Sequence, residues 1–278
     1  MTCVPTLSAL YAYPLKSARG TALTHAPAQA RGLAHDRHWA AVDATGRLIT
    51  QRECLRLALI QPRIEEGRLF LSLQGGPEQA VPDGQGRSLR PLRLWTEEFT
   101  GHDLGDEVAA WLSAALGVEC RLAELPAAFG RWQEGKPYRA PLSFADGNPF
   151  HLVGEGSVGA VAEAAPVPVE APTFRPNLVI AGLDAYAEDF WRLIQIGDVR
   201  LQVVESCDRC GVVNTTAHGT VRAEPLRTLT RLRRTGKHVP LGQHLILAPG
   251  QAEGATLRVG DPVQVLEVGE SPNGFYGE

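Results

Sequence analysis

Two cysteines at C-x-x-C spacing, Cys207 and Cys210, are the residues of this chain whose types and spacing point most directly to chemistry. They follow an apolar run that ends at Val204. A thiolate is a soft donor that suits zinc, copper(I) and iron–sulfur centres, and a C-x-x-C pair also cycles between dithiol and disulfide. Two ordinary buried thiols are the remaining alternative. The pair alone therefore leaves a metal site, a redox site and a structural role open.

Groups that suit an anion occur near the start of the chain. Lys16, Ser17 and Arg19 offer ammonium, hydroxyl and guanidinium donors beside Gly20, a composition that suits a phosphate, with an exposed basic turn as the alternative. Arg37 precedes an apolar run and is either paired with its neighbour Asp36 or aimed at an anion.

Further polar groups precede apolar runs in the second half. Arg175 and Asn177 lie just ahead of residues 178–180, and Ser157 lies near the start of a short helical pattern. The first N–H groups of a helix are unpaired and bind anions readily, so Ser157 is a second candidate contact for a negatively charged ligand.

The elements that must position these residues are mostly strands. Short apolar runs separated by Gly and Pro recur at residues 57–60, 69–73 and 92–95, a pattern typical of a small barrel or sandwich. Helical spacing appears at residues 107–116, with Gly117 as a C-terminal stop, and at residues 225–232. We therefore predict a mainly β fold with some α structure, of the α+β class.

Composition restricts the class of protein. The chain has 278 residues, 44% hydrophobic and 21% charged, which is ordinary for a globular protein of about two domains. A net charge of −4 provides no basic field for nucleic acid. The N-terminus lacks a signal-peptide pattern, and no segment approaches 18 apolar residues, so we expect a cytoplasmic protein without a membrane partner. Five cysteines, an odd number, do not suggest a secreted disulfide framework.

Taken in order, several short motifs together resemble the MOSC-domain proteins, in particular the YcbX-like and mitochondrial amidoxime-reducing component family. They are residues 13–17, 36–39, 143–147, 174–177, 196–198, 207–210 and 260–263. The resemblance implies an N-terminal MOSC β-barrel region in residues 1–122 and a MOSC β-barrel domain in residues 123–270, followed by a loose tail at residues 271–278. It also implies a molybdenum cofactor, Mo-molybdopterin, held between the two parts.

The resemblance further implies a role for each motif residue. Cys210 matches the thiolate that ligates molybdenum and is the expected catalytic residue, whereas Cys207 matches a position that is not a ligand. The expected cofactor contacts are Lys16, Ser17, Arg37, Ser157, Arg175, Asn177, Ser206, Arg209 and Cys210. Asp146 and Asp208 are candidates for proton handling, with a turn cap or an Arg209 partner as the structural alternative, and His244 replaces an aromatic residue common near the cofactor.

The activity that the resemblance implies is a molybdenum-dependent oxidoreductase that reduces N-hydroxylated compounds, such as hydroxylamines, amidoximes and N-hydroxylated bases, to amines or amidines, a detoxification reaction. A non-catalytic carrier or delivery module for the cofactor or for sulfur is the alternative. Many bacterial relatives continue into a ferredoxin-like domain with a C-x4-C-x2-C pattern that this sequence lacks, so we expect a separate electron donor, ferredoxin-like or a flavin reductase. A zinc site is a weaker alternative, because Cys207 and Cys210 supply only two of four ligands and His218 and His244 lack finger-like spacing. A thioredoxin-like dithiol is weaker still, because the βαβ context that it requires is not evident.

Overall fold

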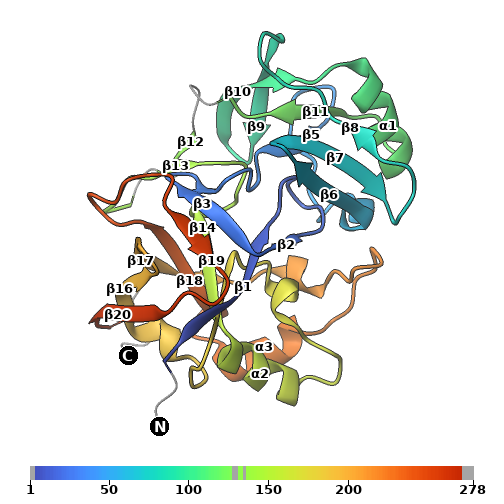
Figure 1. Ribbon diagram of the computed structural model, residues 1–278. Coiled ribbons are helices and arrows are strands. Elements are labelled where there is room, and N and C mark those ends of the chain that lie inside the picture. Colours follow the sequence, from blue (N-terminus) through green and yellow to red (C-terminus); the bar gives the residue numbers. More distant parts are fainter. Residues whose placement is uncertain (1–3, 127–130, 134–135, 271–278) are drawn as a thin grey trace.

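The computed structural model describes residues 4–126, 131–133 and 136–270, and it confirms the predicted mainly β architecture with a few helices. Figure 1 shows two lobes, a larger one built around a long curled sheet and a smaller one at the top of the view. The predicted loose tail at residues 271–278 lies outside the described residues.

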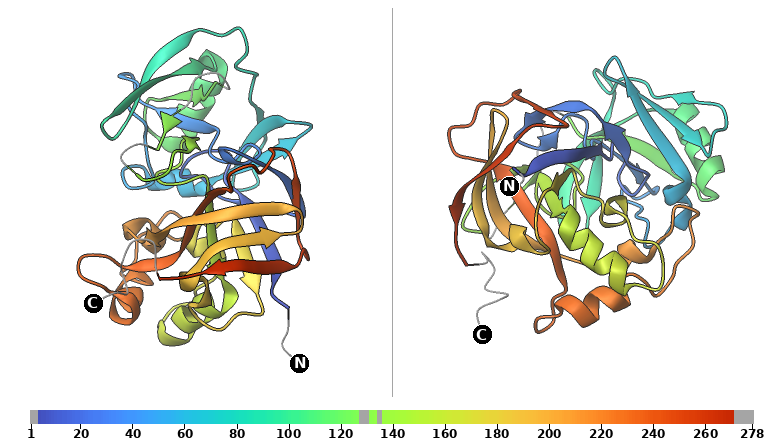
Figure 2. Two further views of the ribbon diagram at one scale, coloured as in Figure 1. Left: turned by 90° about the vertical axis from the view of Figure 1, so that its left-hand side faces the viewer. Right: turned by 60° about the horizontal axis from the view of Figure 1, so that its bottom comes forward.

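The larger lobe contains an eight-stranded sheet that combines both ends of the chain. In order across the sheet its strands are β2 (Thr21–Leu23), β1 (Thr6–Ala12), β15 (Leu178–Ala181), β14 (Phe150–Gly154), β18 (Pro240–Leu247), β17 (Val199–Asp208), β16 (Trp191–Ile196) and β20 (Val263–Val268). Since β1 pairs with β15, a boundary at residue 122 does not separate the two sheet systems. In Figure 2, β16, β17 and β20 run side by side on the face of this lobe.

Alternating burial explains why these strands form one sheet. In β17, Leu201 and Val203 are buried while Arg200 is exposed, as the two-residue period of a strand requires. Their side chains pack with Phe150 and Leu245 in one apolar core. Burial of each such side chain contributes about 1.5–3 kcal/mol, so this core fixes the strands that lead to the C-x-x-C pair.

Short strands complete the two lobes. A three-stranded sheet, β19 (Thr256–Arg258), β3 (His25–Gln29) and β4 (Gly32–Leu33), flanks the large sheet, and β12 (Arg131–Trp132) pairs with β13 (Pro141–Leu142). The smaller lobe has two sheets: β5 (Trp39–Val42), β11 (Arg121–Glu124), β10 (Glu97–Asp103) and β9 (Leu89–Leu94) in one, and β6 (Ile60–Glu65), β7 (Arg68–Leu73) and β8 (Gln79–Ala80) in the other.

The helices follow the predicted patterns. Helix α1 (Asp106–Leu116) buries Val108 and Leu112 and ends at Gly117, which adopts the left-handed conformation with φ 74°, as predicted. Helices α2 (Glu155–Ala164) and α3 (Leu226–Arg233) lie side by side at the bottom of the larger lobe (Figure 1).

Single-turn 3₁₀ segments connect several strands: η1 (Leu55–Leu59), η2 (Ala171–Phe174), η3 (Ala187–Phe190) and η4 (Gly211–Asn214). No helix among the described residues combines the length and the apolar character that crossing a membrane requires.

Candidate functional site

A polar cavity of about 460 Å³ opens between the lobes, where the end of β17, the turn after β1 and the segment between β5 and η1 converge. Eight of the nine predicted cofactor contacts line it: Lys16, Ser17, Arg37, Arg175, Asn177, Ser206, Arg209 and Cys210. The structure therefore brings together residues that are up to 194 positions apart in the sequence, counting from Lys16 to Cys210 (210 − 16).

Irregular pairing at the end of β17 turns consecutive side chains toward this cavity. In a regular strand successive side chains point to opposite faces. The register of β17 on β18 shifts between Val203 and Glu205 and again between Ser206 and Asp208. Such bulges re-aim side chains, and every residue from Glu205 to Cys210 lines the cavity.

Cys210, the predicted metal ligand, is exposed at the start of η4. Its backbone oxygen accepts a hydrogen bond from the N–H of Val213 at 3.2 Å, which holds the turn after β17. One guanidinium nitrogen of Arg52, from the smaller lobe, lies 3.1 Å from the Cys210 Sγ atom. A soft sulfur donor thus lines the cavity beside a positively charged side chain.

Cys207, by contrast, is a buried thiol with several donors around it. Arg209 donates a hydrogen bond to its Sγ atom at 2.7 Å, and the His151 and His244 rings also contact the sulfur. Burial raises the pKa of the Cys207 thiol, but Arg209, His244 and His151 outweigh burial and hold that pKa well below its usual range. The surroundings of Cys207 therefore favour its ionised form, with Arg209, His244 and His151 as the groups that offset a negative charge on the sulfur.

His244 is the cationic partner of this thiolate. Burial lowers the pKa of His244, but Cys207 on one side and Glu205 on the other raise it to about 9. The His244 ring lies 3.4 Å from the Glu205 carboxylate, which also accepts hydrogen bonds from Lys136 and Asn148 at 2.7 Å each. His244 consequently carries a proton at neutral pH inside the cavity.

A buried cation, Lys16, also lines the cavity. Lys16 is 4% exposed and donates hydrogen bonds to the Phe144 carbonyl and the Asp146 carboxylate at 2.7 Å each. Burial, partly opposed by Asp146, lowers the pKa of Lys16 to about 8. Near neutral pH Lys16 is therefore still protonated, and the ion pair with Asp146 offsets the cost of burying its charge.

Two guanidinium groups share one aromatic ring. The Arg37 and Arg175 Cζ atoms each lie 4.3 Å from the centre of the Tyr13 ring. Arg175 donates to the Ala18 carbonyl at 2.7 Å, and burial lowers its pKa to about 10. Arg37 also forms the ion pair with Asp36 that the sequence offered as one alternative, at 2.5 Å. Stacking, this carboxylate and backbone bonds thus fix both guanidinium groups beside the cavity.

Backbone strain also concentrates here. Ser17, Arg37 and Arg175 have φ angles of 68°, 49° and 53°, in the left-handed region that residues other than glycine rarely adopt. Each such residue costs on the order of 1–3 kcal/mol, and strain of this kind clusters at ligand clamps. Three predicted cofactor contacts are therefore held in conformations that the tertiary structure enforces.

Asn177 and Ser206 help to build the cavity wall. The Asn177 amide donates to the Tyr11 carbonyl at 3.1 Å, and its oxygen accepts hydrogen bonds from the His151 N–H at 3.1 Å and from Arg37 at 3.2 Å. The Ser206 hydroxyl donates to Gln243 at 3.3 Å. These bonds tie β1, β14, β17 and β18 together around the site.

Ser157 is the predicted contact that the structure places elsewhere. Its side chain is fully buried, donates to the Glu188 carboxylate at 2.8 Å and accepts from the Tyr186 N–H at 2.7 Å. Glu188 also accepts the Gly154 N–H at 3.0 Å. An internal carboxylate therefore occupies the N-terminal end of α2, where we had expected a cofactor anion, and Ser157 is absent from the cavity lining.

The two aspartates considered for proton handling form fixed pairs. Burial raises the pKa of Asp146, but Lys16 and Arg52 outweigh it and lower the pKa to about 2, so Asp146 stays ionised at neutral pH. Asp208 bonds the His238 ring at 2.9 Å and the Val239 N–H at 2.8 Å. Arg209 bonds Cys207 and the Phe174 carbonyl, not Asp208.

Several cavity residues had no role in the sequence prediction: Gln51, Arg52, Lys136, Asn148, His151 and Glu205. Glu205 lies close to the cysteine pair in the sequence and could have been found for that reason, whereas Arg52 lies in a loop of the other lobe with no motif of its own.

Two other expectations have different outcomes. Arg19, in the predicted anion-binding loop, donates hydrogen bonds to the Ala58 and Ala217 carbonyls instead. In residues 4–126, 131–133 and 136–270, no three His, Cys, Asp or Glu side chains are grouped to hold a metal, so this part builds no closed zinc site.

Comparison with known proteins decides the family. The model for the MOSC N-terminal beta barrel domain matches residues 4–119, and the model for the MOSC domain matches residues 139–264. The chain belongs to the MOSC-domain family. This MOSC protein is 32% identical to mitochondrial amidoxime-reducing component 1 of Mus musculus and 30% identical to that of Homo sapiens, in each case over 95% of this chain and 83% of the relative. It is also 31% identical to the molybdenum cofactor sulfurase of Danio rerio, over 86% of this chain and 32% of that protein.

Proposed function

We propose that this MOSC protein is a molybdenum-cofactor-dependent oxidoreductase that reduces N-hydroxylated compounds to amines or amidines. The observation that carries the proposal is the cavity itself, in which the exposed sulfur of Cys210 shares the lining with the cations Lys16, Arg37 and Arg175 between the two lobes. The similarity to amidoxime-reducing components over nearly the whole chain supports the same substrate class.

The chemistry of the donor set fits a phosphorylated pterin with a metal. Lys16, Arg37 and Arg175 suit a phosphate, and Cys210 suits molybdenum as a soft ligand. Two buried polar atoms of cavity residues, Arg209 Nε and Asn148 Oδ1, have no hydrogen-bond partner among the described residues. A pterin rich in donors and acceptors would satisfy such atoms, which otherwise carry a desolvation cost.

Reduction of an N–O bond to N–H requires two electrons and two protons and releases water. The bound cofactor would supply the two-electron centre at Cys210. His244 is protonated at neutral pH, whereas Asp146 is ionised, so we assign the delivery of protons to His244 with Glu205 behind it. Lys16, Arg37 and Arg175 would bind and orient the cofactor.

The electrons would enter from outside these 278 residues, through a ferredoxin-like or flavin-containing partner protein. The remaining proposed partner is the small N-hydroxylated substrate, and a net charge of −4 gives no reason to add nucleic acid or an anionic membrane. We retain a cytoplasmic location and a role in detoxification as parts of this proposal.

The test is metal analysis and turnover of protein made in a host that synthesises the cofactor. Wild type should contain molybdenum and reduce benzamidoxime or N-hydroxylaminopurine with an artificial electron donor. Cys210→Ser should lose both properties, while Cys207→Ser retains them, because Cys207 is buried and already compensated. Equal losses in the two variants would contradict a single-thiolate site and favour a shared dithiol.

A second candidate function is supported by the similarity to a molybdenum cofactor sulfurase. In that case the protein would hold the cofactor, or sulfur destined for it, without reducing a substrate. Molybdenum-loaded protein that fails to turn over N-hydroxylated substrates with any electron donor, yet transfers its cofactor or sulfur to an acceptor enzyme, would favour this function.

A further inference from the structure

Arg52 is the residue of the smaller lobe that reaches the thiolate side of the cavity. It lies between β5 and η1, and 35% of its side chain is exposed. One guanidinium nitrogen lies 3.1 Å from Cys210 Sγ and the other 3.5 Å from the Asp146 carboxylate. Cys210 and Asp146 both belong to the part of the chain matched by the MOSC domain, so Arg52 bridges the two matched domains.

The Trp95 ring lies against the Arg52 guanidinium group. The Arg52 Cζ atom lies 5.0 Å from the centre of the Trp95 ring, and the Trp95 side chain also hydrogen-bonds Asp146. Planar guanidinium groups stack favourably on indole rings, which fixes the orientation of the fork. Arg52 is thus held by an aromatic face and a carboxylate while one N–H remains directed at sulfur.

Trp95 occupies a loop position whose backbone conformation does not favour tryptophan. Leu94 pairs with Glu97, so Trp95 and Thr96 form a two-residue loop between β9 and β10. Trp95 has a φ of 56°, a conformation for which Asn, Asp or Gly is favoured in such loops, and the residue is 55% exposed. A large exposed aromatic residue in this backbone region is best explained by what its side chain contacts, namely Arg52 and Asp146.

A hydrogen bond from a cation to a metal-bound thiolate has a defined electronic effect. The donor withdraws electron density from sulfur, so the thiolate donates less to the metal. The nearby positive charge also favours the form of the centre that carries more electrons. Both effects raise the reduction potential.

We propose that Arg52, positioned by Trp95 and Asp146, hydrogen-bonds the metal-bound sulfur of Cys210 and thereby raises the reduction potential of the centre, so that the N-terminal domain sets the redox poise of the MOSC domain. The inference rests on the proposed molybdenum site at Cys210. It adds a positioning pair, Arg52 and Trp95, from the opposite lobe.

The experiment is an EPR-monitored redox titration of molybdenum-loaded protein in the presence of mediators. Arg52→Gln should lower the ratio of reduced to oxidised centre at a fixed potential at least tenfold, which is about 30 mV for a two-electron couple. Arg52→Lys keeps the charge but loses the planar fork, and it should shift the potential less. Arg139→Gln is the matched control, because Arg139 stacks on the exposed Trp132 at 4.0 Å but does not line the cavity.

Trp95 variants test the positioning role. Trp95→Ala should reproduce part of the Arg52→Gln shift although Arg52 is intact, and Trp95→Phe, which keeps a ring beneath the guanidinium, should restore most of the wild-type potential. A wild-type potential in Trp95→Ala would overturn the role of Trp95.

The outcomes separate this inference from the proposed function. If wild-type protein made in a host that synthesises the cofactor contained no molybdenum, the proposed molybdenum site itself would be wrong. Molybdenum-loaded Arg52→Gln with the potential of wild type, or with a shift no larger than that of Arg139→Gln, would overturn the role of Arg52 and leave the proposed function standing.

Discussion

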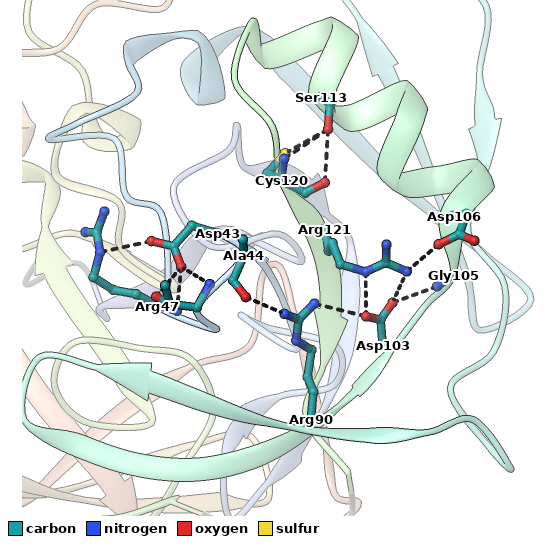
Figure 3. Close-up of polar contacts among 11 residues, drawn as sticks. Asp43, Ala44, Arg47, Arg90, Asp103, Gly105, Asp106, Ser113, Cys120 and Arg121 are labelled. Atoms are coloured by element: carbon teal, nitrogen blue, oxygen red, sulfur yellow. Dashed lines mark hydrogen bonds and ion pairs between the residues drawn. The ribbon is translucent and has the colours of Figure 1, made fainter.

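Arg121 of the smaller lobe and Arg175 of the cavity differ in what surrounds their charge. In the network of Figure 3, Arg121 pairs with Asp103 and Asp106, and Arg90 pairs with Asp103 at 3.0 Å. Each guanidinium there has a carboxylate partner. Arg175, in the cavity, forms no ion pair among the residues that the structure describes, and its hydrogen bond goes to a backbone carbonyl.

The pKa values follow this difference. Hydrogen bonds to Asp103 and Asp106 raise the pKa of Arg121, whereas burial lowers the pKa of Arg175 to about 10. Burial of a charge without an opposite charge is costly, and the protein tolerates it where a ligand supplies the missing charge. The comparison therefore distinguishes charges that stabilise the fold from charges that await an anion.

The largest expected effect that tests this distinction is the loss of cofactor from Arg175→Met. Removal of a buried charged donor costs up to about 3 kcal/mol of ligand binding, which is roughly 100-fold in affinity. Molybdenum content after dialysis measures the loss. The melting temperature of the cofactor-free protein should not fall, because the substitution removes a desolvated cation that forms no ion pair among the described residues.

Arg121→Met is the matched control from the smaller lobe. It should lower the melting temperature of the cofactor-free protein and leave molybdenum content unchanged. The reverse pattern, with stability lost from Arg175→Met and cofactor lost from Arg121→Met, would break the comparison.

The next effect concerns pH and Lys16. Its pKa is lowered from the ordinary 10.5 to about 8, so between pH 8 and 10.5 the unfolded chain binds more protons than the folded chain. The free energy of unfolding should therefore rise with pH in this window, by about 2 kcal/mol between pH 8 and 10. Urea denaturation of cofactor-free wild type and Lys16→Met, compared over this pH range, isolates the contribution of Lys16. If the free energy of unfolding changed with pH in the same way in both proteins, this contribution would be contradicted.

An effect of similar size, on stability alone, is expected for Asp103→Asn. Burial raises the pKa of Asp103, but Arg121 and the N–H of Gly105 outweigh it and lower the pKa below 3.8. Loss of the charged bonds should cost about 2 kcal/mol at neutral pH. The wild-type advantage is present above the ordinary pKa and is lost as acid protonates Asp103, so the two urea midpoints should converge below pH 3.8. Molybdenum content should not change.

The sequence predicted the cavity residues that belong to contiguous motifs. Lys16, Arg37, Arg175 and Cys210 each stand in a short motif, and it was the resemblance of these motifs, taken in order, to the MOSC family that implied that they meet. Mainly β structure followed from short apolar runs between Gly and Pro, and α1 from its periodicity and Gly117. Apolar runs and helical periodicity are local patterns, so a single sequence is enough to reveal them.

What the sequence could not predict depends on tertiary contacts. Arg52 reaches Cys210 across the lobes, and the bulges of β17 that turn Glu205 and Ser206 to one cavity depend on pairing with β18. The role of Glu188 was equally hidden, because an acidic residue in a loop of the sequence gives no sign that it will cap a helix 33 residues earlier, counting from Glu155 (188 − 155).

Ser157→Ala should give the smallest effect, and it tests whether Ser157 stabilises the fold or binds the cofactor. The substitution removes the hydroxyl that joins Glu188 and the Tyr186 N–H, so the free energy of unfolding should fall by about 1 kcal/mol. Molybdenum content should equal that of wild type, because the Glu188 carboxylate and not a cofactor anion occupies the N-terminus of α2. If Ser157→Ala instead lost molybdenum at unchanged stability, the helix end would belong with Arg175 among the charges that await a ligand.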